Sequence, residues 1–183
     1  MRIHVNLFEE QFYQVASEEA IELHKDYEPG SSKLITFMPG ADYNDDLRVK
    51  TLGLEIPYKK QIIAVEYQVG DIQMAQFNCE LKHGLRISDF KITYRSHYTR
   101  LFLKKNILKV ASSDQYLKKY LEDKLMENGL EVIARNNLFT PIMESKKTIK
   151  TDFSLSFEDR KKVLNPMIQF YKDLIDFCIQ HKI

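Results

Sequence analysis

Basic residues crowd into one segment of this 183-residue chain and are its most distinctive chemical feature. Residues 82–109 hold eight lysines and arginines against one acid, Asp89, so the segment carries a charge of +7. Residues 1–46 hold ten acids against three basic residues, which gives −7, although the whole chain is only +1. A cluster of one sign attracts partners of the opposite sign. The pattern predicts a contact patch, for which the candidates are Lys91, Arg95, Arg100, Lys104 and Lys105.

Three explanations of the basic segment remain open. In the first, its charges are solvated or pair with the acidic N-terminal helix inside the fold, where exposed ion pairs add little stability. In the second, it faces an anionic membrane, to which each nearby basic residue contributes about 1 kcal/mol. In the third, it binds nucleic acid, with aromatic rings stacking on bases and basic side chains contacting phosphates. Strand alternation disfavours the third, because it turns the interleaved aromatic residues away from most of the basic ones. Those aromatic residues are Phe90, Tyr94, Tyr98 and Phe102.

The acidic stretch at residues 42–46 is the best candidate for a metal site. Asp42, Asn44 and Asp46 open like a calcium loop, in which alternate side chains supply oxygen ligands. Leu47 stands where such a loop needs glycine, and Gly53 stands where it needs a bidentate acid. The sequence therefore predicts an acidic surface loop at these residues, with neither a metal nor another cofactor.

Sequence signatures of catalysis are absent. The chain has no phosphate-binding P-loop, no GxGxxG fingerprint, no HExxH zinc motif and no GxSxG nucleophile elbow. Ser112, Ser113 and Asp114 are residue types found in catalytic sites. They stand directly before a helical pattern, however, and this position predicts a helix N-cap. A hydrolase remains the rival hypothesis, because a site can assemble in space. Its candidate groups are His83 or His97 with a carboxylate of residues 42–46.

Length and composition indicate one globular domain over residues 1–183, with the N-terminal helix within residues 1–30 as the segment able to lie at its periphery. Hydrophobic residues make up 44% and charged residues 29% of the chain, a balance typical of globular proteins. Cys79 and Cys178 stand in no CxxC motif and are expected to be reduced core residues, with a long-range disulfide as the alternative. There is no apolar run of about 18 residues and no signal-peptide pattern. We therefore expect a cytoplasmic protein, either free or held at the inner face of the membrane by an anchor or a partner.

The stretch that positions the basic segment, residues 107–135, reads as strand, helix, strand. An apolar strand at residues 107–110 precedes the cap at residues 112–114, and Asn128-Gly129 can end the helix. Leu130, Val132 and Ile133 then predict a second strand. The helix between them has one apolar face, formed by Tyr116, Leu117, Tyr120, Leu121 and Leu125.

The other elements predict an α+β fold with a largely antiparallel sheet. Helices at the N-terminus, middle and C-terminus are expected to pack mainly on one face of that sheet. The first helix spans residues 7–25, and the last contains Pro166, which kinks it or marks its true start. Residues 41–57 form a long loop with a short strand at 52–56. The remaining strands are expected at residues 33–38, 60–69, 72–81, 85–98, 138–144 and 148–155.

The segment LKVASSDQYLKKYLEDKLMENGLEVIARNN, residues 108–137, resembles part of a bacterial domain-of-unknown-function family. Members of that family often follow an N-terminal membrane anchor. Its apolar strand leads to a turn of small residues and an aspartate, here residues 111–114, and then to a Leu-rich helix. The resemblance covers about the last two-thirds of the chain. It implies a membrane-associated setting and assigns neither an activity nor catalytic residues.

The leading interpretation is therefore a non-enzymatic bacterial accessory domain. We expect it to bind a partner protein or an anionic membrane surface through its basic strand. A hydrolase with a spatially assembled site and a weak nucleic-acid binder are the alternatives.

Overall fold

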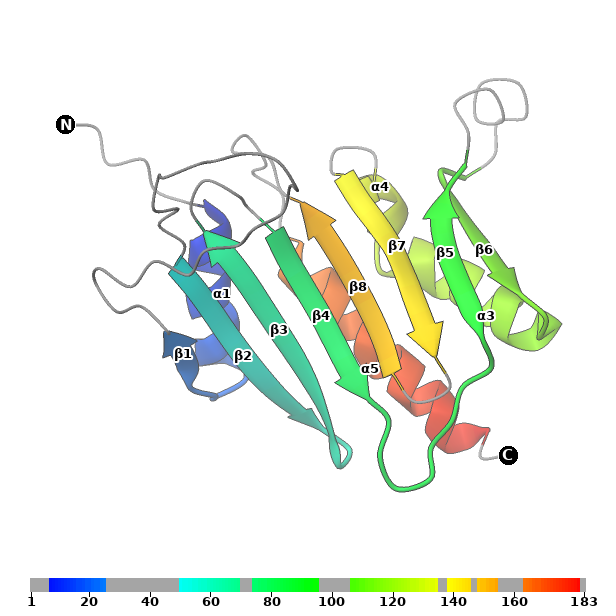
Figure 1. Cartoon of the computed structure of the whole chain (residues 1–183), viewed down its shortest axis with the longest axis horizontal. Helices are drawn as coiled ribbons and strands as arrows, with labels where there is room; N and C mark the ends of the chain where they lie inside the picture. The colour runs from blue at the N-terminus through cyan, green and yellow to red at the C-terminus, as the bar shows by residue number, and fades with distance from the viewer. Residues whose placement is uncertain are drawn as a thin grey trace, which may run out of the picture.

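One antiparallel sheet carries the fold (Figure 1). The computed structural model describes residues 7–25, 50–69, 74–95, 106–134, 138–145, 148–154 and 163–181. Within them the strands lie in the order β1-β2-β3-β4-β8-β7-β5-β6. The strands are β1 Leu23–Lys25, β2 Lys50–Tyr58, β3 Gln61–Val69, β4 Met74–Glu80, β5 Phe90–Tyr94, β6 Leu108–Ser112, β7 Leu138–Ser145 and β8 Thr148–Ser154.

The described helices all pack against the same face of this sheet (Figure 1). They are α1 Leu7–Glu18, α3 Gln115–Glu127, α4 Leu130–Ala134 and α5 Leu164–Gln180. Each strand has a period of two, so alternate residues point toward the helices and away from them. The predicted α+β class, with helices at the N-terminus, middle and C-terminus on one face, is confirmed.

The core lies between the sheet and α5. Leu52, Leu54 and Ile56 of β2 are buried on the helix side, and the aromatic rings of Phe77 and Tyr171 stack with centroids 5.6 Å apart. The Tyr171 hydroxyl donates to the Phe77 carbonyl at 3.4 Å and lies 2.9 Å from Thr151 Oγ1 on β8. Complete burial raises the pKa of Tyr171, so its hydroxyl stays protonated and able to donate. This polar contact fixes the middle of α5 over the middle of the sheet.

Three predictions about the N-terminal half of the chain are wrong in extent. The first helix ends at Glu18, and Leu23–Lys25 pairs with β2 as an edge strand. Residues 50–58 form a full strand where a loop with a five-residue strand was expected, because Leu52, Leu54 and Ile56 alternate with outward residues over the whole stretch. Strand β5 is shorter than predicted and starts at Phe90.

The central stretch matches its prediction up to Gly129 and departs from it afterwards. Asp114 caps α3 by accepting hydrogen bonds from the N–H groups of Tyr116 and Leu117, both at 3.0 Å. Gly129 ends the helix with φ at +69°, a conformation that side chains disfavour. Residues 130–134 then form α4 and not a strand. Leu130, Ile133 and Ala134 are buried at helical spacing whereas Val132 is 54% exposed, so the apolar run has a period of 3.6.

The last helix begins close to Pro166, as one of the two alternatives predicted. Proline fits the first turn of a helix, where its missing N–H group needs no partner. Val163, at the N-cap, makes no side-chain cap hydrogen bond. The buried Gln11 of α1 supplies the missing cap. Its side-chain Oε1 accepts hydrogen bonds from the backbone N–H groups of Val163, at 2.8 Å, and Leu164, at 3.2 Å. A side chain from the first helix therefore completes the start of the last one.

Replacing Gln11 tests this long-range cap. Gln11→Met keeps the side-chain length but leaves the N–H groups of Val163 and Leu164 without their acceptor. We expect the free energy of unfolding in urea to fall by about 1–3 kcal/mol, the cost of unsatisfied buried donors. Gln14→Met, on the exposed side of α1, is the control and should change it little. Equal stability of both variants would show that the cap contributes nothing.

The Asp114 cap should make stability depend on pH. Backbone hydrogen bonds, with that from Leu117 first, hold the pKa of Asp114 below its usual value. A carboxylate with a lowered folded-state pKa stabilises above its unfolded pKa of about 4, and this contribution is lost as pH falls through the folded value. We expect Asp114→Ala to cost about 1 kcal/mol at pH 7. Asp114→Asn, which keeps the cap oxygen, should differ from wild type at pH 7 and converge on it near pH 3 in urea unfolding.

Candidate functional site

The structure describes two of the five residues in the predicted contact patch. Lys91 lies on β5, and Arg95 directly follows that strand. Lys91 is exposed, whereas Arg95 is half-buried, so the two have different surroundings. The other members, Arg100, Lys104 and Lys105, lie outside the described residues, as do the metal candidates Asp42, Asn44 and Asp46.

The sheet face opposite the described helices is called the open face (Figure 1). Lys91 lies on it, because Lys91 is exposed while its strand neighbours Phe90 and Ile92 are buried in the core. Residues paired across antiparallel strands share a face, as do residues two apart along one strand. Thr93, two residues from Lys91, pairs with Lys109 of β6, and Met143 of β7 pairs with both Lys91 and Lys150 of β8. We call the three exposed lysines Lys91, Lys109 and Lys150 the basic end of the open face.

Acidic residues occupy the other end of the same face. Glu55 of β2 pairs with Ala64 of β3, and Ala64 pairs with Asn78 of β4. Glu66 and Glu80 lie two residues from these partners on β3 and β4, and so share their face. We call the exposed carboxylates Glu55, Glu66 and Glu80 the acidic end. Asn78 also pairs with Lys150, which joins the two ends through neighbouring strands.

The aromatic residues beside Lys91 point to the other side of the sheet. Phe90 is buried among the core residues. Tyr94 is half-buried, and its hydroxyl donates to the Ala134 carbonyl of α4 at 3.2 Å. The described part of the basic strand therefore presents lysine without adjacent exposed aromatic rings, which is suited to contacts with carboxylates and poorly suited to base stacking.

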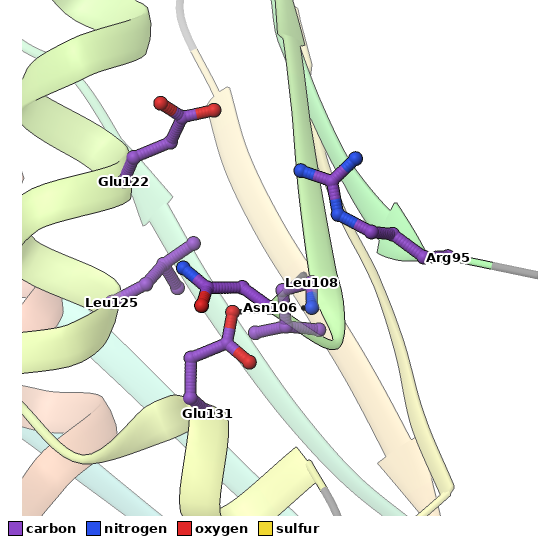
Figure 2. A pocket seen from close by; sticks show the side chains of 6 residues that line it. All are labelled: Arg95, Asn106, Leu108, Glu122, Leu125 and Glu131. Carbon is purple, nitrogen blue, oxygen red and sulfur yellow. Dashed lines mark hydrogen bonds between the residues drawn. The ribbon is translucent and has the colours of Figure 1, made fainter. Parts of the chain in front are cut away.

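Arg95 lines a pocket between β5, β6 and the helix pair α3–α4 (Figure 2). The pocket has a volume of about 230 Å³. Figure 2 shows the Arg95 guanidinium and the Glu122 carboxylate on opposite sides of it. The Nε atom of Arg95 is buried and has no hydrogen-bond partner among the described residues. The full lining is Arg95, Asn106, Leu108, Glu122, Leu125 and Glu131.

Glu131 at the base of this pocket has a structural role. Its two carboxylate oxygens accept hydrogen bonds from Ile107 N at 2.8 Å and Leu108 N at 3.1 Å. Glu131 lies in the first turn of α4, so one side chain ties that helix to the start of the edge strand β6. Sequence reasoning missed this residue, because it assigned residues 130–133 to a strand and gave Glu131 no acceptor role.

The pocket can bind a polar group through side chains of both signs. Its lining combines the Arg95 guanidinium with the carboxylates of Glu122 and Glu131. Both oxygens of Glu131 are occupied by backbone donors, which leaves Glu122 as the carboxylate available to a ligand. This arrangement is suited to electrostatic recognition of a ligand by Arg95 and Glu122.

Of the proposed hydrolase residues, the structure describes only His83. His83 is exposed in the turn after β4 with φ at +58°, while His97 and residues 42–46 lie outside the described ranges. Within those ranges no group of three or more His, Cys, Asp or Glu side chains is placed to share a metal ion. Cys79 and Cys178 are both buried in the core, as predicted, and no disulfide joins them. Burial raises the pKa of Cys79 to about 11, so it carries no reactive thiolate near neutral pH.

At the start of α3 a serine contacts an aspartate whose pKa is also influenced by a histidine, and no motif in the sequence predicted this group. Ser88 Oγ donates to Asp114 Oδ2 at 3.2 Å, and the charge of His181 contributes to the lowered pKa of Asp114. The His181 ring stacks on Phe177 with centroids 4.3 Å apart, and its Nδ1 lies 3.0 Å from the Phe177 carbonyl. The serine hydroxyl thus contacts the aspartate and not the histidine, so the group lacks the nucleophile–base contact of a catalytic triad.

Comparison with models of known protein families and with curated proteins finds no match to the chain. In the described ranges, no helix is both long and apolar enough to cross a bilayer. The open face and the Arg95 pocket therefore have to be interpreted from their own geometry.

Glu131→Gln tests the structural role of the pocket floor. An amide offers only one acceptor oxygen, so one of the two N–H groups at Ile107 and Leu108 should lose its partner. We expect a loss of about 1–3 kcal/mol in urea unfolding and faster amide exchange at these two residues than elsewhere in β6. Glu122→Gln, in the same pocket, makes no such contact and should leave both measurements near wild type. If both variants behave alike, the clamp is not required for the edge strand.

Proposed function

We propose that this protein is a non-enzymatic binding domain whose basic end contacts an acidic surface of a partner protein. The observation that carries the proposal is the placement of Lys91, Lys109 and Lys150 on one sheet face. Their side chains are exposed, and none of them makes a hydrogen bond or ion pair with another described residue. The lysines are therefore available to carboxylates from outside the chain.

The open face favours a protein partner over a flat anionic membrane. A membrane that covers this face would meet Glu55, Glu66 and Glu80 as well as the three lysines, and the two sets of charge oppose each other. Nucleic acid meets the same repulsion from the acidic end. A partner protein can match a bipolar face with charges of both signs, which gives specificity as well as attraction.

The proposed setting is the cytoplasm, with any approach to the inner face of the membrane made through the partner or an anchor. The likeness of residues 108–137 to an often anchored bacterial family is consistent with that setting. An accessory domain of this kind needs no cofactor, and the opposite charges of Arg95 and Glu122 in the pocket support a binding role.

An acidic peptide provides a direct test. A fluorescent Glu-rich decapeptide should bind the wild-type protein, and binding should weaken as salt rises, because exposed charges are screened. The double variant K91E/K109E should bind at least about tenfold more weakly, since two attractive contacts become repulsive. Fluorescence anisotropy measures both affinities.

The matched control is K118E/K119E, which makes the same change in net charge on α3, on the other side of the sheet. This control should keep most of the peptide affinity. An equal loss in both variants would show that net charge alone drives binding, and the basic end would then have no special role. Vesicles with an anionic lipid fraction form a second arm: selective pelleting that depends on Lys91 and Lys109 would favour the membrane instead.

A further inference from the structure

The open face is complementary to a copy of itself. Three exposed carboxylates lie on β2, β3 and β4, and three exposed lysines lie on β8, β5 and β6. Asp152 of β8 shares this face but is half-buried, and it accepts a hydrogen bond from Gln76 of β4 at 2.6 Å. The sheet order places the boundary between the two ends at the junction of β4 and β8, with four strands on each side. The exposed charges of the face are therefore divided about a line parallel to the strands, and the half-buried Asp152 lies next to that line on β8.

A two-fold axis along that line would bring opposite charges together. Rotation about an axis that lies between two faces and parallel to the strands exchanges the left and right halves of the sheet. The acidic end of one copy then faces the basic end of the other, and the reverse contact follows from symmetry. Such isologous pairing is the commonest arrangement in soluble oligomers.

We propose that the protein forms a symmetric dimer in which the open faces of two copies meet, the basic end of each on the acidic end of the other. This inference rests on the proposed function, since it names a second copy of the chain as the partner of the basic end. Charge complementarity favours a second copy, because the exposed charges on the described part of the face are three of each sign.

The size and composition of the open face fit such a contact. Eight strands spaced about 4.8 Å apart span about 34 Å, and strands of this length give about 700 Å² per copy, close to the roughly 800 Å² of a standard interface. Between the charged rows the face carries small residues, Gly53, Ala64 and Ala111, which leave space for long side chains of the facing copy. Sheets that pack face to face cross at about 30°, so the central strands make the closest contact.

Charge exchange tests the dimer with the full-length chain. Sedimentation equilibrium at low salt should give a dimer for wild type, which dissociates as salt rises from about 50 mM to about 0.5 M. K91E/K109E should be monomeric, because both ends of its face are then acidic. E55K/E66K should also be monomeric, because both ends are basic. An equimolar mixture of the two variants should restore a heterodimer. Circular dichroism and thermal unfolding confirm that each variant is folded.

The control separates the geometry of the face from net charge. K118E/K119E carries the same net charge as K91E/K109E but keeps Lys91 and Lys109, so it should dimerise alone and should not pair with E55K/E66K. Association of that control mixture, or a dimer that survives K91E/K109E, overturns the proposal. A monomeric wild type that still binds the acidic peptide through Lys91 and Lys109 also overturns it, while leaving the proposed function intact.

Discussion

The structure depends on one constraint, which is that every described helix lies on the same side of a single sheet. The helices are held there by polar contacts that only this arrangement allows. Tyr171 of α5 reaches Thr151 in the sheet, Tyr120 of α3 donates to the Asp173 carbonyl of α5 at 2.8 Å, and Tyr94 of β5 donates to α4. Because one face is filled in this way, the strand period of two sends every second residue to the other face.

On that second face, the charge pattern of the sequence becomes a pattern on the surface of the fold. Along the chain, the acidic and basic residues form separate segments. The sheet converts part of that separation into opposite ends of one surface, although with a different membership. Lys109 and Lys150 join Lys91, while Arg95 turns into a pocket with Glu122 and Glu131. The fold thus sorts the basic residues into surface contacts and a half-buried group.

Local patterns predicted the fold class and the position of most strands, but not the contacts made across the fold. The Asp114 cap and the Gly129 helix end could be predicted from the sequence, because each acts on residues next to it in the chain. The helical state of residues 130–134 was not, since three apolar residues in five fit a strand equally well until tertiary burial selects one period. Gln11 and Glu131 could not be found from sequence either, because each accepts from backbone donors at distant positions, whose location only the folded chain reveals.

The strand order also determines the order in which the strands can pair during folding. Strands β4 and β5 follow each other in the chain, yet β8 and β7 lie between them in the sheet. During synthesis, the hairpins of the first ninety or so residues therefore emerge with an edge at β4 that has no neighbour until residues 148–154 leave the ribosome. Contacts of such high sequence separation slow folding, and exposed strand edges invite association with other chains. The nascent chain thus passes through a stage in which the place of β8, beside β4, is still empty. Its folding yield should therefore depend on chaperones that shield β4 until the C-terminal hairpin is inserted.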